Sequence, residues 1–386
     1  MRKYGFRISV GEGNRRVKKG ENVKLPVISI RGGPYELGFQ HGSQSRAAVR
    51  ANIDFYLNMW KYFGEAGRDQ VLDEARKFIP YIEKLNPELL EELKGVAAGS
   101  ETLFEEIVAL NCRWELNYAY MPSIVRSSLE GCTAFALTPE ATKNHHTFVG
   151  QHWDYKPHLG NSCIILRINR EEKPNVIMHT EAGIIGHKGF NSAGIGVCLN
   201  FIRCEEDVFR PGFPVWLKIR RILDAESLPE CIKTILTFEQ PNSANMVIAH
   251  RDWEAIDAEC TPKDVFFIHP EHGILTHTNH FQSLGFRSKD TGKGLLPDTV
   301  IRGHRAARLF QERRGDLEFD TIKDILTDHF GHPGSICRHR DERLHPYEQW
   351  ETLTSMIIDL TEARMLYTAG PPCSYPYETV AMDENV

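Results

Sequence analysis

This 386-residue chain lacks long apolar runs, an excess of basic charge and closely paired cysteines. No apolar stretch approaches the ~20 residues that a bilayer-spanning helix needs, so no membrane association is expected. Acidic residues outnumber basic residues by 52 to 46, and the net charge of −6 argues against a nucleic-acid partner, because nucleic-acid-binding domains usually carry a basic face. The segment Met1–Arg7 has no apolar signal core, so we expect a soluble, cytoplasmic protein.

The nine cysteines are scattered and none belongs to a C-x-x-C pair. An odd number of dispersed cysteines in a chain without a secretion signal favours reduced thiols over a disulfide framework. A free cysteine usually acts as a small buried hydrophobe, and less often as a nucleophile. Cysteine chemistry here would therefore be nucleophilic or absent.

The apolar pattern divides the chain into a helical part and a sheet-rich part. Up to about Tyr120 the apolar residues recur every three or four positions, whereas from Cys132 onwards they mostly alternate. Strands grouped in adjacent hairpins, with helices in separate blocks, indicate an α+β fold of antiparallel sheets covered by helices. With no repeats and no low-complexity linker, we expect one compact domain.

Individual elements follow from the same pattern. We expect two short strands in residues 1–30, the second at 27–30, and helices at 48–63, 69–85, 214–224, 228–238, 302–313 and 321–328, with further helices beginning at Pro34 and Pro87 and after Thr102. We expect later strands at 162–168, 175–179, 189–197, 245–249, 255–258, 265–268, 274–278, 356–360 and 364–368, and a loop at 121–130.

The stretch from Gly131 to Tyr155 predicts a hairpin that would bring Cys132 close to Asp154. A backbone cut just before Cys132 would turn its nitrogen into a free amine. Such an amine titrates near pH ~7.7–8.0, so it is a base suited to neutral conditions and lies one residue from a thiol nucleophile. Gly131 also suits a cleavage site, because glycine tolerates strained backbone.

Several motifs occur together in a fixed order. They are Gly131-Cys132-Thr133, Gln151-His152-Trp153-Asp154-Tyr155, Glu181 to Gly186 continuing to Gly189–Asn200, and Leu275 to His280, with Gly33–Gly38, His41-Gly42, Ser335–Arg338 and Gly370–Cys373 near the ends. With these motifs the chain resembles the autoproteolytic acyltransferase/hydrolase family of N-terminal-nucleophile hydrolases, which is typified by penicillin acyl-coenzyme A:isopenicillin N acyltransferase and related to choloylglycine hydrolases. The resemblance covers most of the chain.

The resemblance implies an αββα sandwich of two antiparallel sheets and a precursor that cuts itself between Gly131 and Cys132. The mainly helical segment 1–131 and the catalytic segment 132–386 would then stay associated as two fragments. Cys132 would be the nucleophile and its own amine the base, with Asp154 holding that amine. Asn279, through its side-chain amide, and Asn200, through its backbone, would stabilise the oxyanion.

The resemblance implies a small acyl amide or acyl thioester as substrate and no cofactor, with a coenzyme A thioester allowed as acyl donor. His152 replaces the asparagine that many relatives have before Trp-Asp, and we expect His152, Trp153 and Tyr155 to contact substrate. Glu348-Gln349 stand where the penicillin enzyme has serine and arginine, which argues against penicillin-type substrates. A homo-oligomer is compatible with the sequence.

Two other functions remain open on the residues alone. The chain has 17 histidines, and His277-x-x-His280, His329-x-x-His332 and Cys337-x-His339 raise the hypothesis of a metal-dependent hydrolase. Their spacings match neither a helical H-E-x-x-H motif nor a paired-cysteine site, so we expect no bound metal. The other alternative is a non-catalytic binding or scaffold protein that keeps the fold and is never cut.

Overall fold

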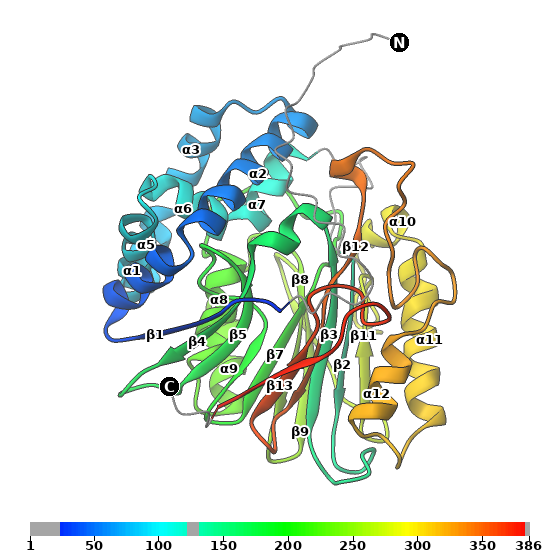
Figure 1. The fold of residues 1–386 in the computed structure, drawn as a ribbon. Helices are drawn as coiled ribbons and strands as arrows, with labels where there is room; N and C mark the ends of the chain where they lie inside the picture. Colours follow the sequence, from blue (N-terminus) through cyan, green and yellow to red (C-terminus); the bar gives the residue numbers. More distant parts are fainter. Residues whose placement is uncertain (1–23, 122–130, 383–386) are drawn as a thin grey trace.

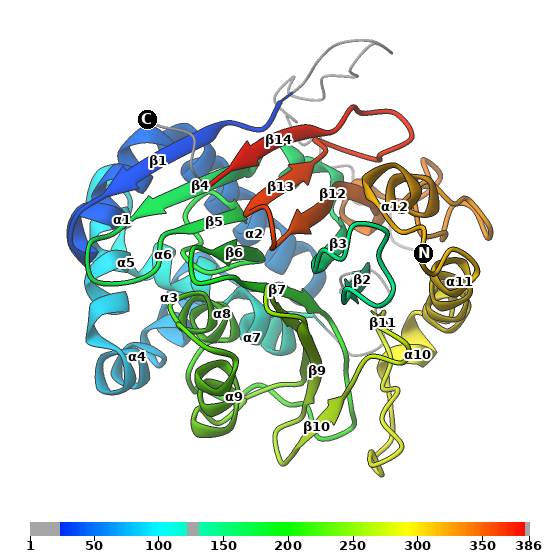
Figure 2. The same cartoon turned by 90° about the horizontal axis from the view of Figure 1, so that it is seen from below.

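Two facing β-sheets form the centre of the protein, with helices on both outer sides (Figure 1). The computed structural model describes residues 24–121 and 131–382. Seen from below, β2 and β3 lie between β7 of the other sheet and helices α11 and α12 (Figure 2). The αββα sandwich expected from the sequence is therefore confirmed. The predicted first strand in residues 1–23 and most of the predicted loop lie outside the described residues.

One outer layer contains the helices that precede the hairpin and two that follow it. They are α1 (Pro34–Gln44), α2 (Arg46–Gly64), α3 (Arg68–Arg76), α4 (Ile79–Leu85), α5 (Pro87–Ser100), α6 (Phe104–Asn111), α7 (Arg113–Tyr120), α8 (Val215–Leu223) and α9 (Leu228–Thr237). The single helix predicted over 69–85 is wrong, because α3 ends at Arg76 and α4 begins at Ile79. Pro80 explains the break, since proline inside a helix has no N–H to donate and clashes with the carbonyl four residues earlier.

The eight-stranded sheet packs against this layer. Its order is β1 (Val27–Arg31), β4 (Cys163–Asn169), β5 (Val176–Glu181), β6 (Gly189–Asn191), β7 (Ile195–Asn200), β8 (Ala244–His250), β9 (Glu254–Cys260) and β10 (Val265–Ile268). All neighbours are antiparallel except β1 and β4, which are parallel. The predicted antiparallel sheets thus include one parallel pair, at this edge. A parallel pair requires a long crossover, and here the whole helical segment α1–α7 lies between the two strands in sequence.

The six-stranded sheet carries the Gly131–Tyr155 hairpin. Its order is β11 (Ile274–His277), β2 (Gly131–Leu137), β3 (Phe148–Tyr155), β12 (Glu351–Asp359), β13 (Arg364–Tyr367) and β14 (Glu378–Ala381). Helices α10 (Gly292–Leu295), α11 (Asp298–Glu312) and α12 (Phe319–Leu326) form the layer on this side, and two short 3₁₀ helices span Pro157–Ser162 and Pro346–Glu348. The predicted hairpin is confirmed, and β2 and β3 are two central strands of this sheet.

Helices α1 and α5 cross at unusually close range. A Cβ atom added to Gly38 would lie 1.9 Å from Glu92 O, and one added to Gly42 would lie 2.3 Å from Val96 O. Side chains at these glycines would force the two backbones apart. The crossing fixes His41, whose Nε2 accepts a hydrogen bond from the Gly183 N–H at 3.0 Å.

Side chains from both sides of the Gly131–Cys132 junction share one hydrophobic core. Tyr56 and Trp60 of α2 belong to the same buried cluster as Cys132, Trp153 and Val197. The segments before and after the junction are therefore held together by packing as well as by the covalent chain. Among the described residues, no helix has both the length and the apolar character that crossing a bilayer requires.

Candidate active site

Cys132 is buried near the start of β2, directly opposite Trp153 of β3. Successive side chains of a strand alternate between faces, so the Cys132 side chain is on the face shared with Trp153, and both belong to the core between the sheets. The Cys132 N–H donates a hydrogen bond to Asn279 Oδ1 at 2.9 Å, and its carbonyl accepts one from Arg302 Nη1 at 2.6 Å. Side chains therefore hold the backbone of Cys132 at both its nitrogen and its carbonyl.

Asp154 is paired in register with Gly131, the residue before the candidate nucleophile. Thr352 Oγ1 donates to its Oδ1 at 2.7 Å, and Arg338 Nε donates to its Oδ2 at 3.1 Å. A Cβ atom at Gly131 would lie 3.2 Å from Asp154 Cβ and 3.3 Å from Arg338 Nε. Glycine at position 131 thus leaves room for the carboxylate and the guanidinium beside the junction.

Two buried arginines share Asp298 and connect the predicted site residues. Arg302 Nε donates to Asp298 Oδ2 at 2.8 Å, and Arg338 Nη2 donates to the same oxygen. Arg302 also donates to Asn279 Oδ1 at 2.9 Å. Although burial opposes ionisation of Asp298, the charges of Arg302 and Arg338 hold its pKa well below the usual range. A charged network therefore surrounds the junction from Asp154 to Asn279.

Sequence reasoning missed the roles of Arg302 and Asp298. Arg338 was part of a recognised motif but had no assigned partner. The only sequence signal for the other two is their spacing of four residues, which places Asp298 and Arg302 on one face of α11. That pattern is common on exposed helices, so it did not indicate a site.

The side chain of Asn279 lies beside Cys132, with its oxygen toward the Cys132 nitrogen. Its Nδ2, the group predicted to stabilise an oxyanion, donates to the Phe201 carbonyl at 2.9 Å in this uncut chain. Asn200, at the end of β7, donates through Nδ2 to the His277 carbonyl at 3.0 Å and accepts from Gln151 Nε2 at 3.0 Å. Asn200 thus joins the site through residues that flank β2.

A buried cluster of Asp257, Glu259 and His277 lies next to Asn200. His277 Nε2 is 3.0 Å from Glu259 Oε1 and 3.9 Å from Asp257 Oδ2. Burial by itself lowers the pKa of His277, but the Asp257 charge and the Glu259 hydrogen bond raise it above the ordinary value. Burial raises the pKa of Asp257 to about 7, despite the opposing effect of His277. This cluster orients the His277 carbonyl that Asn200 contacts.

The three predicted substrate-contact residues divide between the two faces of β3. Trp153 and Tyr155 stack with ring centroids 5.8 Å apart, and Lys188 Nζ lies 4.0 Å from the Trp153 centroid. His152 is on the opposite face, where its Nδ1 lies 2.8 Å from the Ile336 carbonyl oxygen. Burial is the main reason that the pKa of His152 is below the ordinary value. His152 is therefore placed beside the Asp154 layer, away from the Trp153 ring.

A cavity of about 550 Å³ opens beside the charged network. Arg338 and Asp298 line it, together with His339, Glu348 and Trp350. Arg338 also contacts Asp154, which is paired with Gly131. The Arg338 side chain therefore connects the cavity to the Asp154 carboxylate. The cavity has the volume of a small-molecule site and a charged wall.

Comparisons with known proteins identify the family of the chain. The family described as "Acyl-coenzyme A:6-aminopenicillanic acid acyl-transferase" matches residues 141–373. The 40 kDa form of acyl-coenzyme A:6-aminopenicillanic-acid-acyltransferase from Emericella nidulans is 28% identical over 361 residues, which cover 92% of this chain and 95% of that protein.

Two solved structures are more distant. A mutant conjugated bile acid hydrolase from Clostridium perfringens is 16% identical with a TM-score of 0.48, over 66% of this chain and 93% of that one. Penicillin V acylase from Agrobacterium tumefaciens is 9% identical with a TM-score of 0.45, over 66% and 87% of the two chains. The family assignment rests on the sequence matches.

Two facing sheets between helical layers enclose a buried cysteine at the start of β2. The family match extends over more than half of the residues. The chain belongs to the acyl-coenzyme A:6-aminopenicillanic acid acyl-transferase family. Membership of this family supports an enzyme of acyl transfer or acyl hydrolysis.

Proposed function

We propose that this chain is a self-processing cysteine hydrolase or acyltransferase that carries an acyl group on Cys132. The observation that supports the proposal most directly is the environment of the junction. The Cys132 nitrogen is bonded to Asn279, its carbonyl is bonded to Arg302, and the preceding residue is a glycine packed against Asp154. A buried structural cysteine does not require an asparagine side chain at its backbone nitrogen and an arginine at its carbonyl.

Self-cleavage would proceed by an intramolecular acyl shift. The Cys132 sulfur attacks the Gly131 carbonyl carbon, the carbon–sulfur bond forms, and the carbon–nitrogen bond breaks while the nitrogen takes up the thiol proton. Water then hydrolyses the thioester, which leaves a Gly131 carboxylate, a free thiol and a free α-amine. The products are segments 1–131 and 132–386, of 131 and 255 residues. The shared core would keep both segments associated in one compact domain.

The freed amine would act as the catalytic base for substrate. It would take the thiol proton during attack on the acyl carbonyl and return it to the leaving group. Asp154 would hold the amine, and Asn279 and Asn200 would stabilise the oxyanion. Loss of one such donor typically lowers the rate by ~100- to 1,000-fold. In this proposal the Asn279 amide turns from Phe201 toward the substrate after cleavage.

The substrate class follows from the acyl chemistry. A related protein is named for acyl-coenzyme A and 6-aminopenicillanic acid, so we propose a small acyl amide or acyl thioester here as well. Trp153 and Tyr155 would contact the apolar part of the substrate, and His152 would contact it from the face of β3 that carries Asp154. Water would resolve the acyl-Cys132 intermediate in hydrolysis, and an amine would resolve it in acyl transfer.

Cleavage is tested with two alanine variants. We expect intact-mass spectrometry of wild-type protein to show two segments, with a new amino terminus at Cys132, and Cys132→Ala to remain one chain without acyl transfer or hydrolysis. Cys198→Ala is a matched control, because Cys198 is also buried near Cys132 and burial raises its pKa to about 12. An uncut wild-type chain, or unchanged turnover by Cys132→Ala, would overturn the proposal.

The acyl specificity is tested separately with the processed wild-type protein. It is incubated with a panel of acyl amides and acyl-coenzyme A thioesters. After rapid acid quenching, the mass of the 132–386 segment is measured by mass spectrometry. We expect one compound class to leave an acyl adduct on the terminal Cys132 peptide. An adduct on any other cysteine, with none on Cys132, would contradict the assigned nucleophile.

A further inference from the structure

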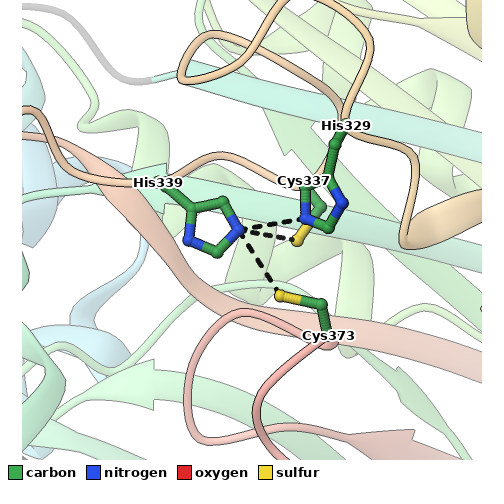
Figure 3. Close-up of side chains that lie close together, drawn as sticks. All are labelled: His329, Cys337, His339 and Cys373. Atoms are coloured by element: carbon green, nitrogen blue, oxygen red, sulfur yellow. Dashed lines mark hydrogen bonds between the residues drawn. The ribbon is translucent and has the colours of Figure 1, made fainter.

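Four metal-binding side chains from two loops meet beside the charged network. His329 follows α12, Cys337 and His339 lie in the loop before β12, and Cys373 lies in the loop after β13. Their ligand atoms all lie within 4.8 Å of one another. Figure 3 shows His339 facing the other three side chains. The sequence motifs included His329, Cys337 and His339 but not Cys373, which is far from the other three in the chain.

The three distances from His339 Nε2 match edges of a tetrahedral metal site. His339 Nε2 is 3.0 Å from His329 Nε2, 3.4 Å from Cys373 Sγ and 3.7 Å from Cys337 Sγ. A regular tetrahedron around Zn²⁺, with bonds of ~2.05 Å to nitrogen and ~2.3 Å to sulfur, has edges of ~3.3 Å between nitrogens and ~3.6 Å between nitrogen and sulfur. Each observed distance is within about 0.3 Å of the corresponding edge.

Backbone hydrogen bonds hold these loops in place. The Cys337 N–H donates to the Asp328 carbonyl at 3.0 Å, and the His339 N–H donates to the Pro333 carbonyl at 3.1 Å. Ser335 Oγ donates to the Cys337 carbonyl at 2.6 Å. The loop carrying three of the four ligands is thus shaped by its own backbone bonds, so that metal binding would require little rearrangement.

We propose that His329, Cys337, His339 and Cys373 bind one Zn²⁺ ion in a closed tetrahedral site. Two imidazoles and two thiolates are the donor set that Zn²⁺ uses in structural sites. Four protein ligands leave no open position for substrate or water, so the ion would stabilise structure and would take no part in acyl chemistry. His329 and Cys373 are exposed, which gives the ion access from solvent.

The bound ion would position Arg338, which lies in the sequence between the proposed ligands Cys337 and His339. The Arg338 N–H donates to Thr352 Oγ1 at 3.0 Å, and its Nε donates to Asp154 Oδ2 at 3.1 Å. Fixing Cys337 and His339 therefore fixes the guanidinium against Asp154, opposite Gly131. His339 also lines the 550 Å³ cavity, so the same ion would stiffen one wall of that cavity.

The site is tested with Co²⁺ as a spectroscopic probe. Chelator-treated protein is reduced, kept free of oxygen and titrated with Co²⁺. We expect one equivalent to bind with thiolate-to-cobalt charge-transfer absorption and intense tetrahedral visible bands. Zn²⁺ should displace it, because a tetrahedral site of two imidazoles and two thiolates suits Zn²⁺. A weak octahedral spectrum without charge-transfer absorption would overturn the proposal, as would a chain that binds no Co²⁺ after full reduction.

Ligand variants show which residues bind. We expect Cys373→Ser and His329→Gln to weaken Co²⁺ binding more than ~100-fold, since changes even in outer-shell partners cost 10–100-fold. His304→Gln, at an exposed histidine outside the group, and Cys231→Ala, at a buried cysteine, should bind normally. Because His329 and Cys373 are exposed, their variants should fold, which circular dichroism verifies. Unchanged Co²⁺ binding in both ligand variants would refute the assignment.

A second readout concerns Arg338 and rests on the proposed self-cleavage. Metal-free precursor should cut itself at least 10-fold more slowly than Zn²⁺-loaded precursor, and added Zn²⁺ should restore the rate in wild-type protein but not in Cys373→Ser. Equal rates with and without Zn²⁺ would refute the positioning role. The Co²⁺ spectrum tests the site even in a chain that never cleaves, so failure of the two proposals can be distinguished.

Discussion

The two hydrogen bonds accepted by Asp154 should affect both the stability of the uncut chain and its cleavage. Thr352 Oγ1 donates at 2.7 Å to one carboxylate oxygen and Arg338 Nε at 3.1 Å to the other, in buried surroundings. An asparagine has only one acceptor oxygen, so in either orientation its NH₂ group faces one of these donors. Because a hydrogen bond to a charged group contributes ~1.5–3 kcal/mol, we expect Asp154→Asn to lower the free energy of unfolding by ~2–3 kcal/mol.

The assay is urea unfolding in the Cys132→Ala background, so that both compared chains stay uncut. Asp252→Asn is the matched control, because the Asp252 side chain is 81% exposed, and such surface changes usually stay within ~0.5 kcal/mol. A loss smaller than ~1 kcal/mol for Asp154→Asn would refute the reasoning, since it would show that neither hydrogen bond contributes as a charge-assisted bond.

Because Asp154 is paired with Gly131, we also expect the same substitution to slow self-cleavage. With Cys132 present, we expect Asp154→Asn to slow appearance of the 131- and 255-residue segments by ~100-fold or more, the usual range when a group acting in proton transfer is impaired. Circular dichroism at the assay temperature separates this effect from unfolding. Cleavage at the wild-type rate in a folded variant would remove Asp154 from the mechanism.

Two further predictions concern the helical layer. Gly38→Ala should destabilise the protein by ~1–3 kcal/mol in urea unfolding, because the added Cβ would lie 1.9 Å from Glu92 O. Gly67→Ala is the control and should cost less than ~1 kcal/mol, because no atom lies within 4 Å of its added Cβ. Equal effects of the two substitutions would contradict the close crossing of α1 and α5. Burial, aided by Arg220, lowers the pKa of His41 from 6.5 to about 4. Between these values the unfolded chain binds a proton that the folded chain excludes, so the free energy of unfolding should fall by ~1.4 kcal/mol per pH unit from this residue as pH drops below 6.5. His41→Gln should reduce that slope, and identical slopes in the two proteins would refute the buried neutral histidine.

Local sequence patterns predicted most of the elements. Alternating apolar residues identified the β2–β3 hairpin, and three- and four-residue spacing identified α2, α5 and α8. In the helices this signal depends only on which face is buried, whereas β2 and β3 are buried on both faces. The helix break before Pro80 was missed although its cause is local. Strand β14 and the short helix α10 were also missed.

The residues of the candidate site were only partly predictable. Cys132 and Asp154 were placed together correctly, since a hairpin register is set by neighbouring strands and one turn. Other features depend on contacts between segments far apart in sequence. They are the direction of strand β1, the pairing of Arg338 with Asp154, the sharing of Asp298 by two arginines and the proximity of Cys373 to His329. Periodicity carries no information on such contacts, because it reports the burial of a side chain and not its partner. The sequence by itself therefore determined the elements, the family and the hairpin with the predicted nucleophile, whereas packing of the two sheets and their loops decided which charges and metal-binding groups surround it.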